Sequence, residues 1–283
     1  MALSTPFVSV AVLMYHAVLA EDDAGEQLDR QDRAYAIGIA EFREHLDLIL
    51  ASGWSMAQIG ASPLPFPNPA SGERGITFTF DDSWLQHARV AAPALLARGL
   101  PAVFFLTTND LGRIHRLSRD EARQLSQLGF SIGSHGMSHR FFTALDNAEL
   151  WAELVDSRKY LEDCIGKSVR WLSLPGGRGN RRVARLAAEA GYEAIFGSRP
   201  GLWHPSLQRR RQPSSLEIIP RLCLRPDQRG KKFLSDLLRH PEAAVKRLAR
   251  GDWLRRLARF FVGDRAYHVL HRIFADTQAP LAL

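Results

Sequence analysis

The stretch ITFTFDD, residues 76–82, joins five apolar or β-branched residues to two adjacent acids. Residues of these types favour extended backbone, so 76–80 is predicted to be a buried strand. Short apolar strands and longer helical segments alternate around it. Strands are expected at 7–14, 102–106, 130–133, 169–174 and 194–197, and helices at 39–50, 85–98, 118–128, 146–165 and 180–190. This alternation predicts parallel pairing, in an α/β barrel or a doubly wound sheet.

The C-terminal part of the chain has a different composition. Residues 199–216 are rich in Pro, Ser, Arg and Gln and are expected to form a loop, followed by a last strand at 218–224. Residues 209–272 contain 17 Lys and Arg against 6 Asp and Glu, so the overall net charge of +7 is concentrated there. We therefore predict one α/β unit over 1–230 and a basic amphipathic helical extension over 231–283.

The basic extension leaves several interpretations open. Apolar residues share one helical face and arginines lie on the others: Leu254, Leu257, Ala258 and Phe261 against Arg255, Arg256 and Arg259. Such a helix can lie on an anionic membrane surface, or pack on the barrel with its basic face in solvent. It could also attract an acidic polysaccharide. Nucleic-acid binding is not expected, because no recognition motif accompanies the charge.

The N-terminus does not have the pattern of a secretory signal. Residues 1–20 carry no Lys or Arg before their apolar run, and that run contains His16. No segment reaches the roughly 18 uncharged apolar residues that a membrane span requires. We expect a cytoplasmic protein, at most peripheral at the inner membrane surface.

Two motifs carry candidate chemistry. Asp81 and Asp82 end the strand at 76–80, and parallel α/β folds collect reactive groups at such strand ends. His135 and His139 follow the strand at 130–133 with i, i+4 spacing, so a helix there would place both imidazoles on one face. One carboxylate and two imidazoles make a three-ligand metal site with open positions, which suits catalysis. The alternatives are an N-capping Asp82 and a structural His pair.

Such a site could activate water for hydrolysis. A bound metal lowers the pKa of a water molecule, and the second carboxylate can take its proton. Adjacent Asp81 and Asp82 could divide the roles of base and ligand.

These motifs resemble those of a known family. TFDD (79–82) and SHGMSH (134–139) are similar to the first two motifs of polysaccharide deacetylases of the NodB-homology type, carbohydrate esterase family 4. VLMYH (12–16) resembles the start of the branch that acts on exopolysaccharides such as poly-N-acetylglucosamine. LPGG (174–177) and AGY (190–192) resemble the third motif and the helix end after it. The resemblance covers about residues 8–225.

The resemblance implies a distorted (β/α) barrel of about seven strands and a divalent metal, usually zinc. Carried over residue by residue, it makes Asp81 the base and Asp82, His135 and His139 the metal ligands. Pro175 and Gly176 would form part of the site wall, where small residues let a sugar approach the backbone closely.

Two departures from the family pattern leave roles open. Many members have an arginine beside the base, two residues before the third-motif proline, where this chain has Ser173; Arg178 and Arg221 are the candidates to replace it. The general acid is expected to be His16, at the end of the first strand, with His204 in Leu-Trp-His as the alternative. Trp84 and Phe141 follow the catalytic motifs and are expected to stack on a sugar ring.

The sequence therefore favours a metal-dependent hydrolase that removes N-acetyl groups from N-acetylhexosamine units of a polysaccharide or glycolipid precursor. Metal-bound water would be the nucleophile. A catalytically weak sugar-binding module on the same fold, and a hydrolase of a small non-sugar amide, are the alternatives.

Overall fold

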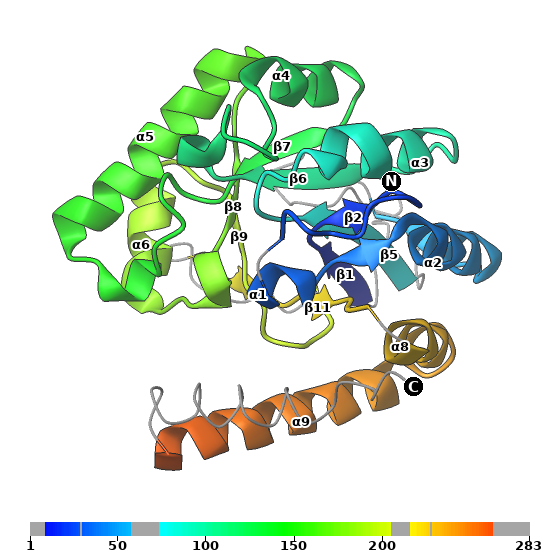
Figure 1. Cartoon of the computed structure of the whole chain (residues 1–283). Helices are drawn as coiled ribbons and strands as arrows, with labels where there is room; N and C mark the ends of the chain where they lie inside the picture. The colour runs from blue at the N-terminus through cyan, green and yellow to red at the C-terminus, as the bar shows by residue number, and fades with distance from the viewer. Residues whose placement is uncertain (1–8, 29, 58–73, 205–215, 227, 263–283) are drawn as a thin grey trace, which may run out of the picture.

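The structure, a computed structural model, describes residues 9–28, 30–57, 74–204, 216–226 and 228–262 (Figure 1). Its centre is a parallel sheet curled into a distorted (β/α) barrel, with helices packed around it, which confirms the expected fold class. The strands in chain order are β1 Ser9–Tyr15, β4 Ser55–Met56, β5 Arg74–Phe80, β6 Ala102–Leu106, β7 Ser131–Ser134, β8 Trp171–Ser173, β9 Ala194–Phe196, β10 Ile218–Ile219 and β11 Leu222–Cys223.

The sheet order is β10-β9-β8-β7-β6-β5-β1-β11, with β4 also paired to β5. Its pairings are parallel throughout the described strands, as the alternating sequence predicts. The predicted last strand at 218–224 is split into β10 and β11. β10 pairs with β9 and β11 pairs with β1, so this one segment bridges both edges of the sheet. Pro220 and Arg221 lie at the break, where Pro220 has no N–H to give to a ladder.

The helices are close to those expected. They are α2 Ile39–Ala51, α3 Ala92–Leu96, α4 Arg119–Gln127, α5 Asn147–Ile165 and α6 Arg181–Glu189. Ser118 with Glu121, and Asp146 with Glu149, form complete capping boxes at the starts of α4 and α5. The predicted helix at 85–98 is shorter and begins with a π-helical turn, His87–Ala91.

A short helix, α1 Arg30–Arg33, precedes the first long helix. It lies between β2 Val18–Leu19 and β3 Ile37–Gly38, which form a separate two-stranded sheet.

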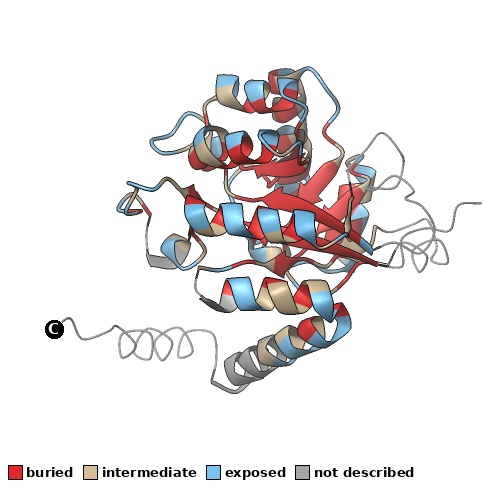
Figure 2. Cartoon of the chain, turned by 90° about the vertical axis from the view of Figure 1, so that its right-hand side faces the viewer, coloured by how far each residue is buried: buried red, intermediate tan, exposed pale blue. Residues whose placement is uncertain are grey.

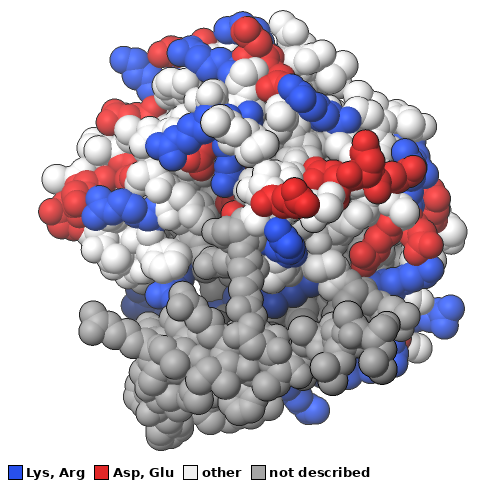
Figure 3. All heavy atoms as spheres, in the orientation of Figure 1, with Lys and Arg blue, Asp and Glu red and all other residues white. Residues whose placement is uncertain are grey.

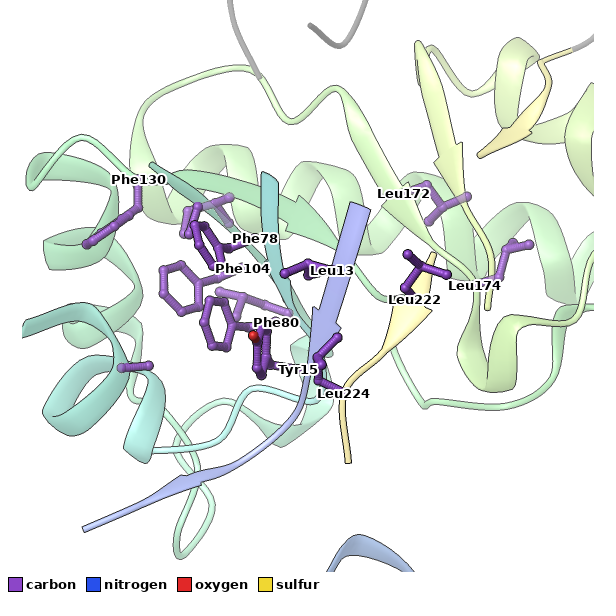
Figure 4. Packing of buried hydrophobic residues seen from close by; sticks show 14 of the residues in the cluster. Leu13, Tyr15, Phe78, Phe80, Phe104, Phe130, Leu172, Leu174, Leu222 and Leu224 are labelled. Carbon is purple, nitrogen blue, oxygen red and sulfur yellow. The ribbon is translucent and has the colours of Figure 1, made fainter. Parts of the chain in front are cut away.

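Side chains alternate between the two faces of the barrel strands. Leu13, Tyr15, Phe78, Phe80 and Phe104 face the helices, where Phe80 stacks on Tyr15 and Phe104 at centroid distances of 5.5 and 4.8 Å (Figure 4). The opposite face fills the barrel interior with a second cluster: Val10, Val12, Ala57, Val103, Phe105, Trp171, Ala194, Phe196, Trp203 and Ile219. Figure 2 shows the strands buried and the helices buried mainly on their inward sides. The same alternation turns Asp81 toward the barrel interior.

The C-terminal extension consists of α8 Gln228–Arg239 and α9 Pro241–Val262. Leu234 and Leu237 of α8 are buried in the cluster that the barrel helices share, and the Trp54 indole donates a hydrogen bond to the Leu238 carbonyl. The side chains at 252–262 lie outside the described residues, and so does the chain from 263 onward, so the predicted amphipathic face at 254–261 is not tested. No helix in the described residues is long and apolar enough to cross a membrane.

Candidate metal centre and catalytic site

The predicted site residues follow the carboxyl ends of three strands of the same sheet. His16 follows β1, Asp81 and Asp82 follow β5, and His135 follows β7. Tyr15 pairs with Phe80 in register, which brings His16 and Asp81 to the same edge of the sheet. Because every strand in this sheet is parallel, its carboxyl ends collect these side chains.

Adjacent residues in a strand point to opposite faces, so two neighbouring aspartates would normally diverge. Here the strand stops at Phe80, and Asp82 and Ser83 adopt positive φ angles of 78° and 55°. Such a backbone is costly for residues with a Cβ and persists where surrounding contacts hold it. Arg116 donates to the Asp82 carbonyl at 2.5 Å, and the Ser83 hydroxyl accepts from Thr107 N at 2.7 Å. The turn thereby brings Asp82 to the same site as Asp81.

Asp82, His135 and His139 form a group that could hold one metal ion. Their ligand atoms lie within 4.8 Å of one another, and Oδ1 of Asp82 is 3.3 Å from Nε2 of each imidazole. That oxygen is buried, and no described residue makes a well-directed hydrogen bond to it. Two nitrogen donors and a buried carboxylate oxygen are a donor set that fits zinc and similar divalent cations.

The orientation of His135 is set by its other ring nitrogen. Nδ1 lies 3.0 Å from the Ser173 carbonyl, which leaves Nε2 to face Asp82. A backbone carbonyl in this position is a common outer partner of a metal-binding histidine, because it fixes the tautomer. Burial raises the pKa of Asp82, but the imidazoles of His135 and His139 outweigh it and hold that pKa well below its usual range.

The histidine pair does not lie on a helix. Residues 135–139 form a loop after β7, in which Gly136 and His139 have φ angles of 77° and 59°. The centroids of the two imidazole rings are 5.0 Å apart. The loop therefore brings the two rings as close together as one turn of a helix would. His139 remains 44% exposed at the side chain, while His135 is buried.

Asp81 is held by an arginine 140 residues further along the chain. Arg221, 1% exposed, donates from Nη1 to Oδ1 at 2.8 Å and from Nη2 to Oδ2 at 2.6 Å. The Ser173 hydroxyl donates to Oδ2 at 3.0 Å and accepts from Arg221 Nη2 at 2.8 Å. Burial raises the pKa of Asp81, but the guanidinium outweighs it and keeps that pKa below its usual value. Of the two candidates for the missing arginine, Arg221 is therefore the one that contacts Asp81.

The two candidate general acids lie at opposite ends of β1. His16 Nε2 is 3.8 Å from Asp82 Oδ2. Burial lowers the pKa of His16, but the Cys223 thiol and the nearby Asp82 and Asp81 carboxylates outweigh it and raise the pKa to about 9. His204 follows Trp203, which pairs with Val10 at the start of β1. The strand separates His204 from the carboxyl-end site.

The third motif contacts one of the two predicted sugar platforms. Phe141, 41% exposed, lines a pocket of about 320 Å³ together with His139, Arg140, Ala144 and Leu145. A Cβ on Gly176 would lie 2.5 Å from the Phe141 ring, so the close approach of the Pro175–Gly176 turn to that ring requires glycine. Arg178 lies over the Phe141 ring, 4.3 Å from its centroid, rather than beside Asp81.

The environment of Trp84 does not suit a sugar platform. Its ring is 3% exposed, packs with Ala17, Leu28 and Ala36, and has the Arg116 guanidinium over it at 3.5 Å. A ring this deeply buried cannot stack on a sugar. Trp84 is therefore not a candidate for stacking on a sugar ring. Phe141, which is exposed, is the candidate for that role.

A larger pocket, of about 730 Å³, lies between α2 and α8 and contains none of the site residues. Figure 3 shows basic and acidic side chains interspersed over the described part of one face, with acidic ones gathered over the region of β2 and α2.

Comparison with protein-family models finds a match over part of the chain. Residues 68–195 match the family model described as polysaccharide deacetylase. The chain therefore contains a polysaccharide deacetylase domain, which confirms the resemblance seen in its motifs.

Particular relatives agree with this assignment. The chain is 25% identical over 191 residues to the putative polysaccharide deacetylase YxkH of Bacillus subtilis (strain 168), a match covering 67% of this chain and 64% of YxkH. It thus spans slightly less than two thirds of that relative.

Solved structures share the fold. Streptococcus pyogenes deacetylase PplD, solved in complex with acetate, has a TM-score of 0.66 and 20% identity, over 81% of this chain and 98% of that chain. IcaB from Ammonifex degensii has a TM-score of 0.60 and 20% identity, over 82% of this chain and 98% of that chain.

Proposed function

We propose that this protein is a metal-dependent N-deacetylase that hydrolyses N-acetyl groups on N-acetylhexosamine units of a polysaccharide or glycolipid precursor. The observation that supports this proposal most is that two sets of side chains lie together at the carboxyl ends of the barrel strands. One is the candidate ligand set Asp82, His135 and His139; the other is an Asp81 carboxylate paired with Arg221. The deacetylase family of the domain supplies the reaction class.

Asp82, His135 and His139 would hold the ion, with zinc the ion that best suits their donors. When bound, it supplies a Lewis acid that polarises the acetyl carbonyl and favours deprotonation of the attacking water. Asp81 is the base that accepts the water's proton. Its Oδ1 receives one hydrogen bond from Arg221, and a carboxylate oxygen can accept a second, so it keeps capacity for a water molecule.

His16 is the proposed general acid. As the water oxygen bonds to the acetyl carbon, the amide C–N bond breaks and the leaving nitrogen needs a proton. His16 lies beside Asp82 at the same strand edge and is partly exposed, so it can reach a substrate there. Phe141 and the Pro175–Gly176 turn form the wall on which we place the sugar.

The alternative of a catalytically weak sugar-binding module is motivated by Ser173 in place of an arginine beside the base and by the open choice of general acid. The contact of Arg221 with Asp81 supports catalysis over this alternative, and the His16 variant below addresses the general acid. Hydrolysis of a small non-sugar amide would use the same catalytic groups, so a comparison of substrates distinguishes this alternative from the proposal.

Acetate release from a panel of N-acetylated oligosaccharides and small amides tests the proposal. Zinc-loaded wild-type protein is expected to release acetate from the oligosaccharides. His139→Ala removes one of three ligands and is expected to lose both the metal, by elemental analysis after dialysis, and the activity. His204→Ala, a histidine replacement at the far end of β1, is the matched control and should change neither. Glycan binding without acetate release by metal-replete wild-type protein would contradict the proposal.

If His16 is the general acid, its replacement should affect turnover but not metal binding, unlike the replacement of His139. His16→Ala should lower kcat about 10²–10⁴-fold while the metal content stays at wild-type level, because His16 is outside the ligand set. The measurement is steady-state acetate release beside metal analysis. Equal turnover in His16→Ala and wild type would remove His16 from the mechanism.

A further inference from the structure

Glu153 places a buried carboxylate beneath the histidine loop. This residue of α5 is 7% exposed. Its Oε2 accepts hydrogen bonds from the backbone N–H groups of Met137 at 2.6 Å and Ser138 at 3.1 Å, and its Oε1 accepts from the Ser138 hydroxyl. Met137 and Ser138 lie between the two candidate metal ligands. The carboxylate therefore bonds directly to the segment that sets the spacing of the two imidazoles.

The loop is fitted closely to this carboxylate. Gly136 has a φ of 77°, and a Cβ there would lie 2.9 Å from Glu153 Oε2. Its N–H donates to the Ser134 hydroxyl, which in turn hydrogen-bonds Ser157, one helical turn beyond Glu153 on α5. The loop is thereby docked on one buried face of α5, with glycine where the approach is closest.

The loop also carries a backbone conformation that needs support. His139 has a φ of 59°, a left-handed conformation that is strained for a residue with a Cβ. Without the Glu153 carboxylate, the N–H groups of Met137 and Ser138 would lose their acceptor. Either effect favours other loop conformations, in which the two imidazoles no longer face Asp82 together.

We propose that Glu153 is a positioning residue for the metal site: its carboxylate sets the 135–139 loop, so that His135 and His139 present their Nε2 atoms to one cation. Glu153 is not a ligand, and it acts through the loop backbone. The inference rests on the proposed metal site but not on the substrate.

The test measures affinity for Zn²⁺ alone, by titrating metal-free protein in competition with a chromophoric chelator. Glu153→Gln keeps the side-chain shape but turns one of the two acceptor oxygens into an NH₂ group, which cannot accept a hydrogen bond, and it removes the negative charge that strengthens the bonds to the loop. Loss of an outer partner of this kind is expected to raise the Zn²⁺ Kd about 10–100-fold. With Co²⁺ as probe, the variant's visible absorption should also differ from wild type, because the ligand geometry is altered.

Glu162→Gln is the matched control. Glu162 is on the same helix and accepts a hydrogen bond from the Val169 N–H at 2.9 Å, but that segment carries no metal ligand. Its Zn²⁺ Kd should stay within about twofold of wild type even if its melting temperature falls. If Glu153→Gln does not fold, Ser138→Ala decides the matter: it removes only the hydroxyl bond and should raise the Kd by about 2–10-fold.

An unchanged Kd in a folded Glu153→Gln protein would overturn the inference, as would an unchanged Kd in Ser138→Ala if only that variant folds. His139→Ala separates this failure from failure of the proposed function. If His139→Ala loses zinc while Glu153→Gln binds it normally, only the role of Glu153 is wrong. If His139→Ala keeps its zinc, the metal site itself is wrong.

Discussion

Replacing Asp81 with asparagine should lower kcat for acetate release about 10²–10⁴-fold, with bound metal unchanged. Asparagine keeps an oxygen that can accept from Arg221, but it cannot take the proton of the attacking water. Asp81 is also outside the ligand group, and both of its carboxylate oxygens accept hydrogen bonds from Arg221. Steady-state acetate release and elemental analysis on the same preparations measure both quantities.

Asp47→Asn is the control for this replacement. Asp47 is an exposed carboxylate paired with Arg98 on the outer surface, so its loss should leave turnover at wild-type level. Near-normal turnover in Asp81→Asn would rule out Asp81 as the base. Loss of metal in Asp81→Asn would instead make Asp81 a ligand.

Replacing Arg221 with methionine should lower the free energy of unfolding by about 3–5 kcal/mol, because the Asp81 carboxylate is left buried without its cation. Arg221 is also at the break between β10 and β11, where it donates to the Gly197 carbonyl at 2.7 Å, so it joins the two edges of the barrel. The same variant should lose turnover, since the base is no longer oriented. Urea denaturation measures the stability change.

A double-mutant cycle makes this prediction specific to the pair. In Asp81→Asn/Arg221→Met both charges are gone, so the double variant should be less destabilised than the sum of the single variants. Arg98→Met breaks an ion pair whose aspartate is 62% exposed, and it should cost no more than about 1 kcal/mol. Strict additivity of the two single effects, or a fully stable Arg221→Met protein, would show that the pair does not stabilise the barrel.

The strands and most helices were predictable from sequence because their signals are local. The β-branched and aromatic runs give the strands β1, β5 and β6, and the Ser118–Glu121 and Asp146–Glu149 pairs mark the starts of α4 and α5. The meeting of the aspartates and histidines also follows from local signals, once the strands are known to be parallel and both motifs follow strand ends.

What the sequence could not predict depends on long-range contacts and on backbone conformation. Arg221 is 140 residues from Asp81, so nothing local distinguishes it from Arg178 as the partner of the base. The i, i+4 spacing of the histidines is compatible with a helix, but the segment is a loop whose N–H groups donate to Glu153 and Ser134, and Ser134 in turn contacts Ser157. Glu153 itself looks like an ordinary acidic residue of an amphipathic helix. Its signal would have been its position on the face that also carries Leu150, Leu154 and Ser157.

The central claim is that one divalent cation is held by Asp82, His135 and His139 beside the Asp81–Arg221 pair. Anomalous diffraction at the zinc edge from crystals of the zinc-loaded protein tests it directly. We expect one strong peak at about 2.0–2.2 Å from Asp82 Oδ1, His135 Nε2 and His139 Nε2. A peak bound elsewhere, or no peak among these three side chains in zinc-replete crystals, would contradict it.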